Sequence, residues 1–178
     1  MSSLVALLLG ASLVHAARDA DAVKSLPDCG PLQSHWFSGY LNVSDGKALH
    51  YVFVGSLSPD NATDPIIVWF NGGPGCSSME GLFAENGPYV FDDGEDVIKP
   101  NPYPWNLRAH LLYIESPAGV GYSINKTVDD GRHNDLSQAE DALAAIQDFF
   151  VGFPEFLKND LYISGESYAG IYVPYLAW

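Results

Sequence analysis

The chain has 178 residues, of which 47% are apolar and 13% aromatic, which is enough to bury the core of one domain and excludes disorder as the default. Its 22 acidic and 8 basic residues give a formal net charge of −14. Because such a surface repels a phosphate backbone and lacks a basic stripe, we expect no nucleic-acid partner.

The N-terminus has the features of a secretory signal peptide. The apolar run from Leu4 to Val14 is too short to span a bilayer, and small residues precede the first charge at Arg18. We predict a signal peptide over residues 1–16, a mature domain over 17–178, entry into the secretory pathway and no stable membrane anchor. The alternative, a buried N-terminal helix, is disfavoured by the missing cap and the abrupt polar switch.

Three glycosylation sequons agree with this route, and they begin at Asn42, Asn61 and Asn125. The two cysteines, Cys29 and Cys76, are expected to be paired in an oxidising compartment, with each other or with another partner. Their spacing fits no zinc signature, so we expect no metal.

The first half of the mature chain predicts strands and a glycine-rich connection. Runs over 36–41 and 49–57 flank the turn Ser44-Asp45-Gly46 and indicate an antiparallel pair. Ile66 to Phe70 has no polar alternation, which is typical of a strand covered on both faces. A short helix is expected from Ser77 or Ser78 to about Asn86, followed by a loop over 92–106.

The second half alternates strands with helices. Leu111 to Glu115 is a second buried strand, and Leu161 to Ser164 a third. Between them a helix begins at Asn134 or Asp135 and ends at Gly152 and Pro154. Its expected apolar stripe is Leu136, Ala139, Leu143, Ile146 and Phe150. A last helical pattern starts at Tyr168, and this order predicts an α/β sheet rather than a bundle or sandwich.

The segment Gly165-Glu166-Ser167-Tyr168-Ala169-Gly170 is a G-x-S-x-G-like strand-to-helix turn. In such an elbow the serine adopts a strained conformation, and the residues two before and two after it must be small. Ala169 satisfies this condition in place of the second glycine. Ser167 is therefore a candidate nucleophile, and the alternative is a structural turn serine.

A second glycine-rich loop, Asn71 to Gly75, comes directly after the strand at 66–70. Ligand crevices of open α/β sheets form at this end of the strands. Backbone amides of Gly72 or Gly73 could form half of an oxyanion hole, with the amide of Tyr168 as the other half. The alternatives are a tight connection without a ligand, or a phosphate loop, which the missing Lys disfavours.

Three blocks together, residues 69–78, 115–123 and 165–170, closely resemble the serine carboxypeptidase family of α/β-hydrolases, from about Trp36 to Trp178. The resemblance implies an α/β-hydrolase-type sheet without a cofactor, acting on a peptide or protein with a free C-terminus. It implies that Ser167 is the nucleophile and that Gly73 and Tyr168 are the oxyanion donors. The implied carboxylate-binding group is Asn71, Gly72, Glu85 and Glu166.

The paired carboxyls have a chemical consequence. Glu85 and Glu166 can bind a third carboxylate only if protons are shared among them, so the site should favour acidic conditions. An acidic vacuole or lysosome, or the extracellular space, is the expected location. The family pattern also implies that Cys76 pairs with a downstream cysteine that this chain lacks.

The chain departs from the family pattern after Ser167. In α/β-hydrolases an Asp and then a His come later in the chain than the nucleophile, whereas His35, His50, His110 and His133 all precede it and fit ordinary surface or strand histidines. We therefore expect a sheet truncated after the elbow and the start of the next helix, with little or no turnover. The alternatives are an acyltransferase or esterase on the same scaffold, or a non-catalytic fragment.

Overall fold

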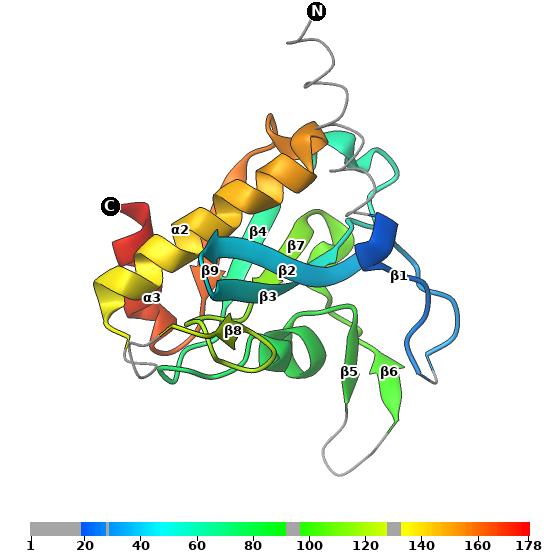
Figure 1. The fold of residues 1–178 in the computed structure, drawn as a ribbon. Coiled ribbons are helices and arrows are strands. Elements are labelled where there is room, and N and C mark those ends of the chain that lie inside the picture. The colour runs from blue at the N-terminus through cyan, green and yellow to red at the C-terminus, as the bar shows by residue number, and fades with distance from the viewer. Residues whose placement is uncertain (1–18, 28, 92–96, 128–132) are drawn as a thin grey trace, which may run out of the picture.

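The computed structural model describes residues 19–27, 29–91, 97–127 and 133–178. Its main sheet has the strand order β1-β2-β3-β7-β4-β9, and β8 pairs with β3 (Figure 1). The strands are β1 Ala22–Val23, β2 Trp36–Ser44, β3 Lys47–Val54, β4 Ile66–Phe70, β7 His110–Ile114, β8 Ile124–Asn125 and β9 Leu161–Gly165. The signal peptide predicted over 1–16 lies outside the described residues.

The predicted strands are present in the predicted arrangement. β2 and β3 form an antiparallel pair, and Gly46 turns between them with a φ of 82°, a value that glycine adopts without steric cost. β4 lies between β7 and β9 and runs parallel to both. Their carboxyl ends consequently meet at one edge of the sheet.

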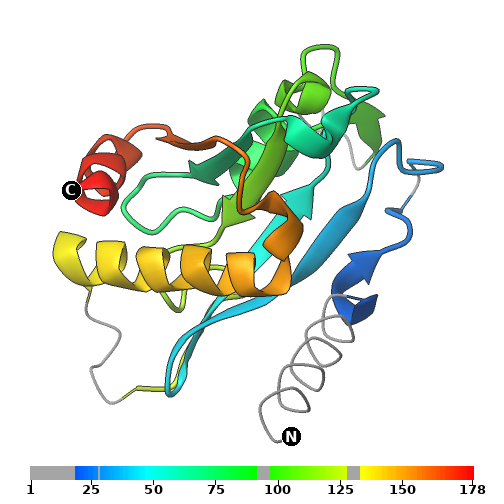
Figure 2. The same ribbon diagram turned by 90° about the horizontal axis from the view of Figure 1, so that it is seen from above.

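Two helices lie in the second half of the chain. Helix α2, Asp135–Gly152, begins with a capping box in which the Asn134 side chain accepts from the Ser137 amide, as the sequence predicts for a cap at this point. Helix α3 covers Ala169–Ala177. Figures 1 and 2 show α2 lying across one face of the sheet, with α3 beside it.

The apolar stripe expected on α2 is partly wrong. Leu136 and Leu143 are 55% and 48% exposed. The buried face instead runs through Ala139, Ala142, Ala145, Ile146 and Phe149. Alanines on this face let α2 approach β2 and α3 closely, so small residues rather than leucines mark the packed side.

The segment after β4 is more structured than expected. The short helix predicted near Ser77 is present, and it continues as a π-helix, η2 Gly81–Glu85. The loop predicted over 92–106 contains part of a hairpin, β5 Tyr89–Phe91 with β6 Ile98–Pro100. Residues 92–96 of that loop lie outside the described residues. The remaining elements are 3-10 turns: η1 Asn61–Thr63, η3 Trp105–Leu107 and η4 Pro154–Phe156.

The sheet buries both of its faces. On the α2 side, Tyr51 and Phe53 of β3 pack against Phe149 at ring-centroid distances of 6.2 and 5.2 Å. On the other side, Val52 and Val54 join a second cluster with Trp36 and Trp69. Cys29 packs against this second cluster, and both cysteines are free thiols. Of the two expected alternatives, pairing with each other is therefore wrong, and pairing with another partner stays a prediction.

We predict that Phe149→Ala lowers the free energy of unfolding by about 3–5 kcal/mol, because the ring is fully buried between strand and helix side chains. Leu143→Ala on the same helix is the control and should cost no more than about 1 kcal/mol. Urea unfolding followed by circular dichroism measures both. Equal losses from the two variants would contradict this packing.

Candidate active site

Ser167 occupies a strained bend between β9 and α3. Its φ is 55°, a left-handed value that is uncommon for a residue with a side chain. A Cβ on Gly165 would lie 2.3 Å from the Phe70 carbonyl oxygen and 2.5 Å from the Ala169 Cβ. Only glycine fits at 165, and Ser167 is exposed at the tip of the bend.

The glycine loop, residues 71–78, lies directly against this elbow. A Cβ on Gly72 would come within 2.4 Å of the Tyr168 backbone nitrogen. Gly73 has a φ of 104°, and the Cys76 amide closes the loop by donating to the Gly72 carbonyl at 3.0 Å. The structure thus brings together the loop and the amide that the sequence analysis proposed as oxyanion donors.

The proposed carboxylate-binding residues also form one group. The Asn71 side-chain amide donates to Glu85 Oε1 at 2.7 Å, and the Gly72 amide donates to Glu166 Oε1 at 3.2 Å. Asn71 Oδ1 in turn accepts from Trp69 Nε1 at 2.8 Å. Because this second bond fixes the amide orientation, Asn71 presents its NH₂ group to Glu85.

The two carboxyls affect each other. Burial raises the pKa of Glu85, and the nearby charge of Glu166 raises it further, against the opposing hydrogen bond from Asn71. A raised pKa favours the protonated carboxyl, which can donate to another carboxylate. The group therefore has the chemistry to bind an anion under acidic conditions.

Of the four described histidines, His50 and His110 have both ring nitrogens bonded to other groups, and His35 is exposed. His50 contacts Glu115 at 3.0 Å, and His110 contacts the Asn61 carbonyl at 2.8 Å. His133 contacts the Ala118 carbonyl through Nε2 at 2.8 Å, and its buried Nδ1 has no partner among the described residues. His50 and His110 are buried rather than at the surface. That none of the four histidines is a displaced base stays a prediction.

Hollows flank the elbow on the α2 side. One, of about 220 Å³, is lined by residues of the glycine loop, the start of α2 and α3, among them Pro74, Gln138 and Tyr168. The Tyr168 hydroxyl donates to Asp135 Oδ1 at 3.1 Å. The nucleophile candidate thus stands beside open space rather than under packed side chains.

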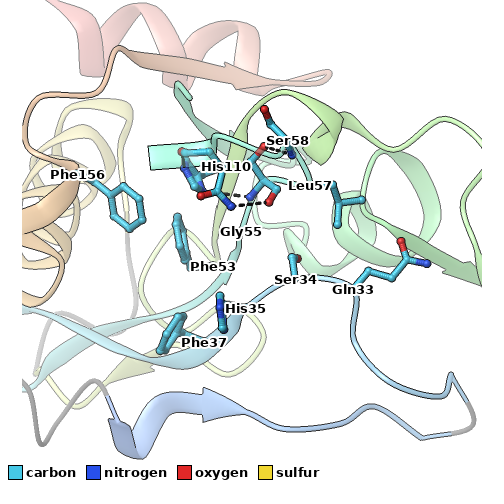
Figure 3. A pocket seen from close by; sticks show the side chains of 12 residues that line it. Gln33, Ser34, His35, Phe37, Phe53, Gly55, Leu57, Ser58, His110 and Phe156 are labelled. Carbon is cyan, nitrogen blue, oxygen red and sulfur yellow. Dashed lines mark hydrogen bonds between the residues drawn. The ribbon is translucent and has the colours of Figure 1, made fainter. Parts of the chain in front are cut away.

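A further cavity, of about 300 Å³, lies at the opposite end of the parallel strands. Figure 3 shows Phe53, Phe156 and His110 along one side of it. The His110 ring stacks on Phe53 at 5.6 Å, and burial lowers the pKa of His110. Both of its ring nitrogens bond to backbone groups, so neither nitrogen of His110 is available as a base in this cavity.

Sequence reasoning missed the side chains that support the site. Glu115 appears in the sequence only as part of a motif, yet it is fully buried behind the glycine loop and bonds to Ser77 and His50. Local pattern gives no sign of a contact between such distant positions. Within the described residues, no cluster of His, Cys, Asp and Glu suits a metal ion, and no helix is long and apolar enough to cross a membrane.

Comparisons with known proteins identify the family. The serine carboxypeptidase family model matches residues 27–178. The chain is 48% identical to the lysosomal protective protein of Mus musculus over 98% of this chain and 36% of that protein. It is 41% identical to serine carboxypeptidase 1 of Hordeum vulgare over 91% of this chain and 34% of that protein.

A solved structure shows the same fold. The prohormone-processing carboxypeptidase Kex1 of Saccharomyces cerevisiae superposes with a TM-score of 0.73 and 26% identity, over 90% of this chain and 38% of that one. The sheet and helices are therefore those of an α/β-hydrolase. The chain spans about a third of the length of the curated relatives it matches. The chain belongs to the serine carboxypeptidase family.

Proposed function

We propose that this chain is part of a serine-type carboxypeptidase, which releases C-terminal residues from peptides or proteins through an acyl-enzyme. The observation that carries the proposal is the strained Ser167, exposed beside the glycine loop. Family membership supports a hydrolase. A peptide with a free C-terminus is the substrate that a nucleophile next to a carboxylate-binding group would select.

In the proposed reaction Ser167 Oγ attacks the carbonyl carbon of the last peptide bond. The carbonyl oxygen becomes an oxyanion, which the amides of Gly73 and Tyr168 stabilise, and the C-terminal amino acid leaves once its nitrogen is protonated. Water then attacks the ester on Ser167 and releases the shortened peptide.

The proposed carboxylate group positions the substrate. Asn71, Gly72, Glu85 and Glu166 hold the terminal carboxylate, so the bond presented to Ser167 is always the last one. The hydrogen bonds among these four residues support a shared role. A peptide whose C-terminus is amidated lacks the matching charge and should be a poor substrate.

The attack also needs a base to accept the Ser167 proton. Both ring nitrogens of His50 and His110 are bonded to other groups. His35 and His133 precede Ser167 in the chain, whereas the base of an α/β-hydrolase follows the nucleophile. For the 178 residues by themselves we therefore propose little or no peptide turnover. The oxyanion donors and binding alone leave about 10³–10⁴-fold catalysis over water when a triad is disabled.

We also propose passage through the secretory pathway to a lysosome-like or vacuolar compartment or to the cell exterior. The apolar leader and the three sequons support this route, and one relative is named as lysosomal. Asn42 and Asn61 are exposed, whereas Asn125 is half-buried and its side-chain oxygen accepts from the Thr127 amide and hydroxyl.

The nucleophile is tested by fluorophosphonate labelling followed by peptide mapping. We expect slow labelling of the chain at Ser167 and none of Ser167→Ala. Ser164→Ala, within β9 and ahead of the elbow, is the control and should label like the wild type. A chain that never forms the adduct would favour the non-catalytic alternative.

The carboxylate group is tested by pH-dependent binding of an N-acyl amino acid, measured by NMR titration. Because protonated Glu85 donates to the ligand and ionised Glu85 repels it, affinity should fall about tenfold or more as pH rises through the raised pKa of Glu85. Glu85→Gln should flatten this dependence. Glu140→Gln, at an exposed position on α2, is the control and should leave the dependence unchanged. Affinity that rises with pH would refute the group.

The secretory route is tested by expression in eukaryotic cells and enzymatic deglycosylation. Removal of an N-glycan converts the asparagine to aspartate, so mass spectrometry should find this conversion at the exposed Asn42 and Asn61. The same chain from a bacterial cytoplasm is the control. Unmodified asparagine at both positions in the eukaryotic material would speak against this route.

A further inference from the structure

A buried carboxylate lies behind the glycine loop. Glu115 directly follows β7 and its side chain is fully buried. A buried charge is costly unless donors surround it. Three donors do so: the Ser77 hydroxyl on Oε1, and the Tyr122 amide at 2.8 Å and His50 Nδ1 at 3.0 Å on Oε2.

These donors come from three separate segments. Ser77 belongs to the C-terminal end of the glycine loop, His50 to β3, and Tyr122 to the loop between β7 and β8. The opposite ring nitrogen of His50 contacts the Ser38 hydroxyl on β2 at 3.0 Å. A chain of polar contacts therefore crosses the sheet from β2 to the glycine loop.

The carboxylate has no freedom to relocate. The Glu115 amide donates to the His50 carbonyl at 3.0 Å, and the Glu115 carbonyl accepts from the Ser123 hydroxyl at 2.6 Å. A Cβ on Gly121 would lie 1.9 Å from Oε1, so the loop wraps tightly over it. Burial alone would raise the pKa of Glu115, but the bonds from His50, Ser77 and Tyr122 outweigh burial and lower it.

The bond between Glu115 and Ser77 is connected to the candidate oxyanion hole through Cys76 and Gly72. Ser77 is adjacent to Cys76, whose amide donates to the Gly72 carbonyl at 3.0 Å, and Gly72 lies against the Tyr168 nitrogen. Ser78, the next residue, bonds to the two ends of the same region: it accepts from the Asn71 amide at 3.2 Å and donates to the Ile114 carbonyl at 2.7 Å. The Ser77–Glu115 bond is the second side-chain anchor at this end of the loop.

We propose that Glu115 is a positioning residue: through Ser77 it fixes the glycine loop against the elbow and so sets the spacing between the Gly73 and Tyr168 amides. This inference rests on the proposed function, because only an oxyanion gives that spacing a chemical role. Glu115 touches no reacting atom. It acts on the reaction through the loop.

The test uses two NMR signals of the 178-residue chain itself. The nuclear Overhauser effect between the Gly72 Hα protons and the Tyr168 amide proton reports the loop-to-elbow contact. Hydrogen exchange of the Cys76 amide reports closure of the loop. Ser77→Ala should weaken the first signal and accelerate the second about tenfold, as expected for local opening. Glu115→Ala should do the same, because it removes the carboxylate that accepts from the Ser77 hydroxyl.

Ser38→Ala is the matched control, since it removes a serine hydroxyl from the far end of the same polar chain. It should leave both signals unchanged. Exchange of the Leu112 amide in the centre of β7 should stay at the wild-type rate in all variants, which separates loop release from global unfolding.

Three results would overturn the inference: unchanged loop signals in Ser77→Ala, equal changes in Ser38→Ala, or faster exchange at Leu112 matching that at Cys76. None of these readouts requires turnover. A chain that positions its loop as described but never labels at Ser167 would contradict the proposed function, while the effect of Glu115 on the loop position would still be supported.

Discussion

The backbone contact between Gly72 and the Tyr168 nitrogen is the constraint on which the site depends. It exists because β4 and β9 are neighbouring parallel strands whose register pairs Phe70 with Gly165, so both chains leave the sheet at the same height. Side chains at 72 or 165 would push the two segments apart. A nucleophile and two candidate donors can converge here only because the backbone itself forms the surface of contact.

The same approach brings acidic groups together. Glu166 precedes the nucleophile and bonds to the Gly72 amide, while Glu85 at the end of η2 reaches Asn71. Burial raises the pKa of Glu85, and the charge of Glu166 adds to this effect. Glu115 has the opposite behaviour: enclosed by donors, its pKa is lowered. The Glu85 environment therefore favours the protonated carboxyl, and the Glu115 environment favours the carboxylate.

Much of the fold could be predicted because its signals are local. β4 and β7 are continuous apolar runs, the α2 cap is an Asn with Ser137 three residues on, and the elbow is a short motif with required small residues. The burial of α2 is less predictable, since which face packs depends on how close β2 and α3 come. The hairpin β5–β6 leaves little trace in the sequence because its strands are only three residues long and their pairing is not visible in either alone.

Some residues of the candidate site could likewise be predicted from local sequence, and others could not. Residues that contribute backbone amides or a nucleophile, such as Gly73 and Ser167, can be recognised in the sequence, because they lie in glycine-rich loops or in strand-to-helix turns. Glu115 and His50 lie 65 positions apart, and neither has a pattern that points to the other. What joins them is the sheet order, in which β3 and β7 are neighbours although β4 separates them in the chain. Groups that orient a site are therefore found by following buried charges to their donors, which requires the tertiary structure.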